Sequence, residues 1–495
     1  MKGVPRFLAF DLGAESGRAI VGTLEQGRLT LEEIHRFPNE PVEVCGTLYW
    51  DVLALYRHVL EGMRSYVQRF GDTVQGIGLD TWGVDFGLLD RDGHLLQNPV
   101  HYRDRRTAGM VEAVTARMPA DQLFRRTGMA LLPIQTLCQL LSLRSRPHSI
   151  LDQAATLLMM PDLLGYFLTG VPRCERTIAV TTQLYNLRTA DWDDDLCAAF
   201  DLPRSLLPPL IPPGTELGPL QAAVARSTGL RGARVLVPCT HDTAAAVAAV
   251  PGEGEDWLFL SSGTWSILGV LIDEPVTDER ARARGLCNEL TLGRFFLGKN
   301  LMGLWLLQQV RREWVRQGQP CSYSELMEWA EQAPPGGPLV EVNHPSFLAP
   351  ESMTEALAEF CRQTGQAPPQ DPPETVRCIL ASLALAYRQA AEELAEVTGR
   401  KWRVLHLVGG GALNRPLCQM TAEALGLPVE AGPVQATAAG NVLGQALGAG
   451  MLSSPEELRS IVRRSLARTR YQPTATRPWE MEYRRYRERI CRSHG

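Results

Sequence analysis

Residues 7–23 read FLAFDLGAESGRAIVGT, an apolar run that ends on an acidic residue, passes through a short turn and becomes apolar again. The pattern predicts a strand, a tight turn and a second strand. Gly13 and Gly17 bracket the turn, where glycine permits backbone N–H groups to approach an anion closely. Asp11 ends the first strand, where its carboxylate can meet a phosphate-bound metal ion. A lone hairpin of this kind is more often ordinary turn chemistry, so its meaning depends on the rest of the chain.

A second stretch repeats this pattern later in the chain. Residues 257–271 read WLFLSSGTWSILGVL, an apolar strand, a Ser-Ser-Gly-Thr turn and another apolar strand. Gly263 offers backbone and Thr264 a hydroxyl, which suits the outer phosphates of a nucleotide. Two such hairpins, each near the start of an α/β half, indicate a duplicated α/β domain that grips a polyphosphate from both sides.

The length of the chain agrees with a duplication. At 495 residues it is too long for one compact core, and its 45% hydrophobic and 21% charged residues are ordinary for a globular protein. The Pro- and Gly-containing segment at residues 250–256 suits a hinge, so we expect domains over residues 1–250 and 251–455. The Arg-rich tail over residues 456–495 is expected to be a solvated helix, with nucleic-acid binding a distant second.

Composition excludes several classes of function. A net charge of −5 gives no reason to expect nucleic acid or an acidic membrane surface as a partner. The 11 cysteines are scattered, without the spacing of a zinc site or a disulfide framework, although pairing of Cys361 with Cys378 stays open. The first ten residues hold no signal peptide and no stretch has the length of a membrane span, so we expect a cytoplasmic protein.

Two further motifs place acidic residues near predicted strand ends. Residues 74–89, VQGIGLDTWGVDFGLL, predict two strands around a turn at Trp82-Gly83, with Asp80 and Asp85 on either side. Such residues face a cleft in an open sheet, or bond their own turn, and the two readings are about even. The charged segment YRDRRT at residues 102–107 is more simply a solvated face.

The trio His241-Asp242-Thr243 precedes an alanine-rich helix predicted over residues 244–250. Asp or Thr in this place is a good helix cap. A carboxylate held at a helix start at the edge of a sheet is equally suited to accept a proton from a substrate hydroxyl. From these residues alone the capping role leads.

Two more motifs follow in the second half of the chain. We expect a helix from Asn300 to residue 317, with Asn300 and Gln308 as polar exceptions among apolar side chains. A strand over residues 405–408 leads into three glycines at 409–411, which let a flat ligand such as adenine and ribose lie against the backbone. A tight turn alone would not need all three.

Taken together, these motifs resemble a known family. The segments DLGAESGR, GLDTWGVDF, YRDRRT, HDT, SSGTWS, NLMGLWLLQ and VGGGALN occur in the order found in bacterial rhamnulokinases. These belong to the FGGY carbohydrate kinase family, within the superfamily of actin, hexokinase and the chaperone ATPases. The resemblance runs from about residue 7 to residue 450, and the motifs are specific jointly rather than singly.

The resemblance implies an α/β fold with two actin-like (ribonuclease H-like) domains around a central cleft. ATP and Mg²⁺ would bind on one side of the cleft and a small ketose on the other. The protein would be a monomer or a homodimer, without nucleic-acid or membrane partners. The implied reaction transfers the γ-phosphoryl group of ATP to the 1-hydroxyl of L-rhamnulose.

The resemblance also implies a role for each motif. Asp242 would be the catalytic base, and the groups at the sugar would be Gly83, His241, Asp242, Thr243 and Asn300. The groups at ATP would be Gly13, Ala14, Glu15, Ser16, Gly17, Thr264, Gln308 and Gly410. Asp11 would face Mg²⁺, through water, because that ion dehydrates reluctantly.

One residue departs from the family pattern, and three alternatives stay open. Glu15 stands where related kinases often carry Ser or Thr, so we expect its carboxylate to turn away from phosphate and only its backbone to take part. The first is that the substrate is another ketose, such as L-fuculose. The second is a non-catalytic sugar sensor of the same fold, and the third is an ATP-driven machine that hydrolyses ATP without sugar.

Overall fold

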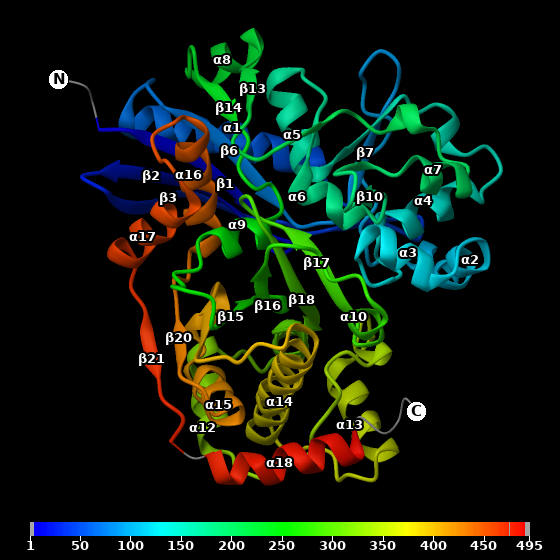
Figure 1. The fold of residues 1–495 in the computed structure, drawn as a ribbon, viewed down its shortest axis with the longest axis vertical. Helices are drawn as coiled ribbons and strands as arrows, with labels where there is room; N and C mark the ends of the chain where they lie inside the picture. The colour runs from blue at the N-terminus through cyan, green and yellow to red at the C-terminus, as the bar shows by residue number, and fades with distance from the viewer. Residues whose placement is uncertain (1–3, 475, 491–495) are drawn as a thin grey trace. The chain divides into compact units, whose positions relative to one another are not determined.

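The computed structural model describes residues 4–474 and 476–490 (Figure 1). The chain divides into two compact units, each built from several segments. The first comprises Met1–Pro251, Leu271–Leu297 and Ala436–Leu466. The second comprises Gly252–Val270, Gly298–Gln435 and Ala467–Gly495. The chain therefore passes between the units several times.

The elements of the first unit are β1 (Arg6–Leu12), β2 (Ser16–Glu25), β3 (Arg28–Pro38), β4 (Val42–Val44), β5 (Thr47–Tyr49), α1 (Val52–Phe70), β6 (Gly76–Thr81), β7 (Phe86–Leu89), η1 (Arg105–Thr107), α2 (Met110–Arg117), α3 (Ala120–Thr127), α4 (Thr136–Arg144), η2 (Ile150–Asp152), β8 (Thr156–Met159), α5 (Met160–Thr169), β9 (Cys174–Glu175), α6 (Arg176–Ala179), η3 (Val180–Thr182), β10 (Tyr185–Asn186), β11 (Asp191–Trp192), α7 (Asp194–Ala199), η4 (Arg204–Leu206), β12 (Leu210–Ile211), β13 (Glu216–Pro219), α8 (Ala222–Thr228), β14 (Arg234–Leu236), α9 (Asp242–Ala248), α10 (Glu279–Ala283), β17 (Leu286–Leu290), α16 (Ala436–Gly448) and α17 (Pro455–Ser465).

The elements of the second unit are β15 (Trp257–Ser262), α11 (Trp305–Arg316), α12 (Tyr323–Gln332), η5 (Pro345–Phe347), α13 (Met353–Gln363), α14 (Pro372–Thr398), β19 (Val404–Val408), η6 (Gly410–Leu413), α15 (Arg415–Leu425), β20 (Val429–Ala431), β21 (Thr469–Tyr471) and α18 (Thr476–Arg489). Strands β16 (Trp265–Ile272) and β18 (Phe295–Met302) run from one unit into the other.

The main sheet of the first unit has the strand order β13-β14-β6-β1-β2-β3. Strand β1 is buried on both faces, which explains its continuous apolar run. Phe10 belongs to the apolar cluster that includes residues of α1. Its neighbour Ala9 points the other way, into a cluster with residues of α9 and α16. Figure 1 shows α16, in orange, beside the blue strands β1 to β3.

The sheet of the second unit is built around the second hairpin. Strand β15 pairs antiparallel with β16 and parallel with β19, and β20 and β21 extend the sheet beyond β19. The long helix α14 begins after Asp371, whose carboxylate accepts the N–H of Glu374 and caps the helix. The strands and helices predicted around both hairpins are thus present, and the α/β fold is confirmed.

Two local predictions need correction. The strands β6 and β7 within residues 74–89 do not pair with each other, because β7 pairs antiparallel with β8 instead. The helix expected from Asn300 begins only at Trp305, and Asn300 lies on β18. The reason is local: the N–H groups of Gly303 and Leu304 donate to the carbonyls of Thr264 and Gly263, so this segment closes the hairpin before the helix begins.

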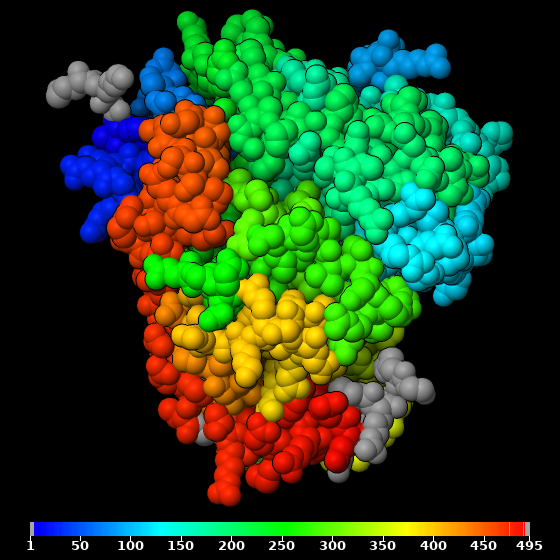
Figure 2. Space-filling model, viewed as in Figure 1, coloured from blue at the N-terminus to red at the C-terminus, as the bar shows by residue number. Residues whose placement is uncertain are grey.

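The Arg-rich tail is helical, as expected, but its described part is not simply solvated. Helix α18 lies against α14, as the red and yellow residues of Figure 2 show. Its Trp479, Tyr483 and Tyr486 are buried, and Arg388 of α14 lies over the ring of Tyr483. Residues 475 and 491–495 of the tail lie outside the described residues. Apolar side chains at helical spacing thus hold the tail to the second unit. No helix among the described residues is long and apolar enough to cross a membrane.

The contact of α16 with α9 gives a prediction on stability. A Cβ atom on Gly440 would lie 1.9 Å from the carbonyl oxygen of Ala245, a backbone atom that cannot rotate away. We expect Gly440→Ala to lower the free energy of unfolding by about 2 kcal/mol or more, because overpacking outweighs the gain of about 1 kcal/mol in helix propensity. Denaturant unfolding of Gly440→Ala and of Gly337→Ala, where an added Cβ meets nothing within 4 Å, provides the comparison. Equal stability of the two variants would contradict this account of the packing.

Candidate functional site

The first hairpin is held in shape by a residue that the sequence did not single out. The N–H of Gly13 donates to the carbonyl of Ser16 at 2.9 Å. The side-chain amide of Asn39 donates to the carbonyl of Gly13 at 2.9 Å, and its N–H donates to that of Glu15 at 3.0 Å. The side chains of Ala14 and Glu15 are only partly buried. Asn39 follows β3 directly, so only the pairing of β3 with β2 brings it here.

The structural reason for glycine differs between the two positions, Gly13 and Gly17, of this hairpin. A Cβ atom on Gly17 would lie 2.2 Å from the ring of Phe37, its partner across the β2–β3 pair. At Gly13 the nearest atom to such a Cβ, the carbonyl oxygen of Ser16, is 3.5 Å away. Packing alone therefore explains Gly17, whereas close packing does not explain Gly13.

Two carboxylates lie side by side at the end of the main sheet. Asp11 on β1 is in register with Asp80 on the parallel strand β6 and opposite Arg18 on β2, with which it pairs. Asp80 is fully buried, and the amide of Asn441 on α16 donates to its Oδ2 at 2.6 Å. Its Oδ1 has no hydrogen-bond partner among the residues that the structure describes. Burial raises the pKa of Asp80 well above its ordinary value, and the charges of Asp11 and Asp242 raise it further.

Asp242 stands at the first turn of α9 but does not cap it. The cap position is His241, which makes no side-chain capping bond, and the Asp242 carboxylate accepts only from its neighbour Thr243, whose N–H lies 2.5 Å from Oδ1. The capping role favoured from the sequence is therefore not what the structure has. The Asp242 side chain keeps 31% of its surface exposed, and burial of the rest raises its pKa. The charge of Asp11 acts in the same direction.

His241 lies between two carboxylates of the first unit. Its Nε2 is 3.5 Å from Oδ1 of Asp242, and its Nδ1 is 3.1 Å from Oε2 of the buried Glu289 on β17. Burial of the imidazole lowers its pKa, but Glu289 and Asp242 raise it, and the net direction is upward. The positive charge of His241 in turn lowers the pKa of Asp242, so the two side chains tune each other.

Glu175 fixes the chain just before this pair. Its fully buried carboxylate accepts hydrogen bonds from the N–H of Thr240 at 3.0 Å and the hydroxyl of Thr240 at 2.9 Å. It also accepts from the N–H and hydroxyl of Thr177. The N–H of Thr81 donates to the carbonyl of Thr240 and ties the segment to β6. No motif surrounds Glu175 in the sequence, so only the fold identifies it.

The turn at Gly83 has unusual backbone geometry. Val84 adopts a φ of 67°, which costs free energy for a β-branched residue. Its N–H donates to the hydroxyl of Thr181 at 3.1 Å, and its carbonyl accepts from the hydroxyl of Thr136 at 2.7 Å. A Cβ atom on Gly83 would lie 3.0 Å from the side chain of Thr181. Bonds from two other elements thus hold Gly83 and Val84 in place.

Asp85, on the far side of this turn, is a structural residue. Its Oδ2 accepts the indole N–H groups of Trp50 at 2.6 Å and Trp82 at 2.9 Å, and its Oδ1 accepts from Gln139 at 3.0 Å. Burial raises its pKa to about 6, although these hydrogen bonds oppose the shift. Of these partners only Trp82 belongs to the turn, so Asp85 has a structural role but is held mainly by residues distant in the sequence rather than by its own turn.

The second unit holds the other predicted residues. Thr264 closes the hairpin and accepts the N–H groups of Gly303 and Trp305 at its carbonyl. Asn300 on β18 and Gln308 on α11 each bury a side-chain oxygen that has no hydrogen-bond partner among the described residues. A buried amide oxygen without a partner is uncommon and is satisfied readily by a ligand or by water.

Only one of the three glycines at residues 409–411 is open to a ligand. Gly409 has a φ of 86°, and a Cβ there would lie 2.9 Å from the carbonyl oxygen of Ser262. A Cβ on Gly411 would lie 2.1 Å from the hydroxyl of the same residue. Gly410 is exposed, and a Cβ there meets nothing within 4 Å. The expectation that all three serve a flat ligand is therefore wrong, because two of them serve packing against β15.

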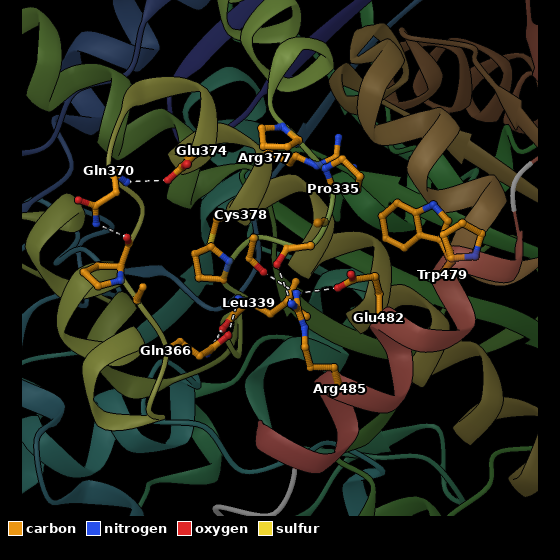
Figure 3. A pocket seen from close by; sticks show the side chains of 18 of the residues that line it. Pro335, Leu339, Gln366, Gln370, Glu374, Arg377, Cys378, Trp479, Glu482 and Arg485 are labelled. Carbon is orange, nitrogen blue, oxygen red and sulfur yellow. Dashed lines mark hydrogen bonds and ion pairs between the residues drawn. The ribbon is translucent and has the colours of Figure 1, made fainter.

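A separate cavity of about 410 Å³ lies in the second unit, away from all of these residues (Figure 3). The loop at residues 334–339, the loop at residues 365–370 and side chains of α14 and α18 line it. Arg485 of α18 pairs with Glu482, three residues earlier on the same helix, and donates to the carbonyl of Gly336 in the loop. Cys378 lines the cavity, and both it and Cys361 are free thiols.

Comparison with known proteins identifies the family. The model of the FGGY family of carbohydrate kinases, N-terminal domain, matches residues 6–249, and that of its C-terminal domain matches residues 258–449. The chain is 41% identical to a rhamnulokinase of Bacteroides thetaiotaomicron over 478 residues, 96% of this chain and 98% of the relative. It is 36% identical to a rhamnulokinase of Bacillus subtilis over 462 residues, 93% of each chain.

Solved structures confirm the fold. A gluconate kinase from Lactobacillus acidophilus aligns with a TM-score of 0.80 and 16% identity, over 99% of this chain and 98% of that one. A Plasmodium falciparum glycerol kinase with ADP aligns with a TM-score of 0.77 and 16% identity, over 99% of each chain. The two matched domains together span most of the sequence, and the chain belongs to the FGGY family of carbohydrate kinases.

Proposed function

We propose that this kinase transfers the γ-phosphoryl group of ATP to the 1-hydroxyl of L-rhamnulose, a step of L-rhamnose catabolism. Identity of 35 to 41% with several rhamnulokinases, over at least 92% of this chain, supports the choice of sugar. The observation that carries the chemistry is the Asp242 carboxylate, which stays partly exposed beside the buried carboxylates of the first unit. Because ATP is the donor, we place the reaction in the cytoplasm.

Asp242 is the base in this proposal. It accepts the proton of the 1-hydroxyl as that oxygen attacks the γ-phosphorus, and the bond from the γ-phosphorus to the bridging oxygen of ADP breaks. Its raised pKa makes it a better proton acceptor than an ordinary aspartate. Gly83, His241 and Thr243 of the first unit and Asn300 of the second position the sugar.

Backbone and hydroxyl groups of the two hairpins bind the phosphates. Gly13 to Gly17 supply backbone in the first unit, and Thr264 supplies a hydroxyl in the second, while Gln308 and Gly410 receive the nucleoside. Phosphoryl transfer depends mainly on positioning and on stabilisation of charge, so such groups lower much of the barrier. The Glu15 carboxylate is expected to point away from the phosphates.

The residues of the first unit fit a Mg²⁺ ion. Asp11 and Asp80 bring carboxylates together, and the buried Oδ1 of Asp80 has no partner within the described part of the chain, which suits a hard cation or its bound water. Asp11 is the residue that would hold the ion, through water. When bound, Mg²⁺ neutralises charge on the transferring phosphate.

The alternative functions differ in whether ATP is hydrolysed and in which sugar, if any, is required. The comparisons favour neither L-fuculose nor a sugar sensor. Measuring ADP release with a panel of ketoses distinguishes these hypotheses. A rhamnulokinase should show its highest kcat/KM with L-rhamnulose. A sugar sensor would release no ADP with any sugar, and a chaperone-like machine would release ADP without sugar. Monomer or homodimer remains a prediction.

Replacement of the base tests the mechanism. We expect Asp242→Asn to lower kcat by about 100- to 10,000-fold, because it removes the proton acceptor while the amide oxygen can still accept the N–H of Thr243. The measurement is ADP release with saturating ketose. The matched control is Asp195→Asn, at an exposed carboxylate paired with Arg126, which should keep wild-type turnover. An Asp242→Asn variant with undiminished kcat would overturn the assignment.

The pairing of His241 with Asp242 predicts a shift in the pH profile. The base works deprotonated, so kcat/KM should fall as the pH drops through the raised pKa of Asp242. The imidazolium of His241 lowers that pKa, so His241→Gln should move the acidic limb to higher pH. The profile of kcat/KM from acidic to neutral pH reports the shift, with His94→Gln, an exposed histidine of the same unit, as the control. An acidic limb that stays in place or moves to lower pH contradicts the coupling.

Substitutions at residues 410 and 411 test a role in nucleotide binding separately from a role in packing. Gly410→Val should raise KM for ATP severalfold with little change in Tm, because the side chain occupies open space that we assign to the nucleoside. Gly411→Ala should lower Tm, because its Cβ meets Ser262. Steady-state kinetics and thermal unfolding of both variants test this. An unchanged KM for ATP in Gly410→Val would remove Gly410 from the nucleotide site.

A further inference from the structure

Two histidines and a glutamate outside the kinase site converge on one point. His35 lies on β3, and His58 and Glu61 lie three residues apart on α1. Nε2 of His35 is 3.3 Å from Nδ1 of His58, Nδ1 of His58 is 2.9 Å from Oε2 of Glu61, and Oε2 of Glu61 is 3.6 Å from Nε2 of His35. We propose that these three side chains form a binding site for a divalent transition-metal ion such as Zn²⁺.

The distances suit coordination. Bonds of about 2.0 to 2.1 Å from zinc to nitrogen or oxygen place neighbouring tetrahedral ligands about 3.3 to 3.4 Å apart. The three observed separations, 2.9 to 3.6 Å, lie on both sides of that value. Imidazole nitrogens with one carboxylate oxygen favour zinc or a similar transition metal over Mg²⁺, which prefers oxygen ligands alone.

Hydrogen bonding satisfies this arrangement poorly. A ring nitrogen carries at most one hydrogen, and Nδ1 of His58 faces both the Glu61 carboxylate and Nε2 of His35. If Nδ1 is protonated, its hydrogen serves two acceptors or faces a second N–H; if it is not, its lone pair faces the carboxylate. A single cation accepts lone pairs from all three atoms and removes the conflict.

The site is accessible and held in shape. The side chains of His35, His58 and Glu61 are 21%, 23% and 39% exposed, so an ion can enter from solvent and keep water as a further ligand. The ring of His58 stacks on the buried ring of Phe37 at 4.4 Å between centroids and 9° between planes. Packing therefore fixes the orientation of one imidazole before any ion arrives.

A second cluster among the described residues shows the contrast. Asp90, Asp92 and His94 also bring ligand atoms together. There Oδ1 of Asp90 accepts the N–H groups of Asp92 at 2.9 Å and His94 at 2.8 Å, so the turn itself explains the cluster. Within residues 4–474 and 476–490, no comparable backbone bonds to these side chains account for the cluster of His35, His58 and Glu61.

The site would act as a structural link rather than in catalysis. It joins α1 to β3, and Phe37 lies between His58 and Gly17 of the phosphate hairpin. An ion there would restrain the edge strand against the helix behind the hairpin. Its ligands belong to none of the groups assigned to ATP, sugar or Mg²⁺, so its loss should reduce stability without removing a catalytic group.

Metal binding to the full chain tests the proposal. Equilibrium dialysis against Co²⁺ alone, followed by visible absorption, should show one saturable ion per chain with a ligand-field spectrum of low coordination number, and Zn²⁺ should displace it. We expect Zn²⁺ to raise Tm of the wild type by a few degrees, because ligand binding to the folded state stabilises it.

Variants locate the ion. His58→Ala and His35→Ala should weaken binding by about tenfold or more and abolish the rise in Tm, whereas His94→Ala should keep both. Glu61→Gln provides a second test that preserves a hydrogen bond to the ring, in case a histidine variant unfolds. Absence of saturable binding, equal binding by the wild type and Glu61→Gln, or loss of binding in His94→Ala would each overturn the proposal. Loss of binding with kinase activity retained would support it independently of the sugar.

Discussion

The first unit depends on two carboxylates placed side by side on parallel strands inside an apolar sheet. Asp11 and Asp80 occupy equivalent positions on β1 and β6, and a buried carboxylate is costly unless it is paired or hydrogen-bonded. Arg18 pairs with Asp11 from the neighbouring strand. Asn441 bonds Asp80 from α16, a helix 361 residues further along the chain. The return of this late segment to the first unit therefore supplies Asp80 with a hydrogen-bond donor.

The helix α16 is tied to the strands by more than this amide. Gln445 donates to Oδ1 of Asn441 at 2.7 Å and also to the carbonyl of Leu8 on β1 at 3.3 Å. Gly22 on β2 faces Val442 of α16, and Gly440 of α16 faces the backbone of Ala245 on α9, so the contact of α16 with the sheet and its contact with α9 each require a glycine. The position of the carboxylates thus depends on packing that is specified far from them in the sequence.

The sequence predicted those secondary-structure elements that depend on interactions between residues close together in the chain. Apolar periodicity gave both hairpins, α1 and α14, because those elements bury one face or both. Residues whose partners are distant could not be found in this way: Asn39, Glu175 and Glu289 carry no motif, and only the folded chain brings them to the site. The glycines at 409–411 misled for the same reason, because Ser262, which excludes a side chain at two of them, lies on another strand.

The surroundings of four aspartates, Asp11, Asp80, Asp85 and Asp242, decide which of them is suited to be the catalytic base, and the sequence alone could not distinguish them. Asp85 accepts two indole N–H groups and is enclosed, and Asp80 is fully buried against Asn441. Asp11 is neutralised in part by Arg18. Asp242 alone combines partial exposure with a bond only to its sequence neighbour, and a proton acceptor must be reachable by the hydroxyl that it serves. Burial and the charge of Asp11 raise the pKa of Asp242, which makes its carboxylate a stronger proton acceptor.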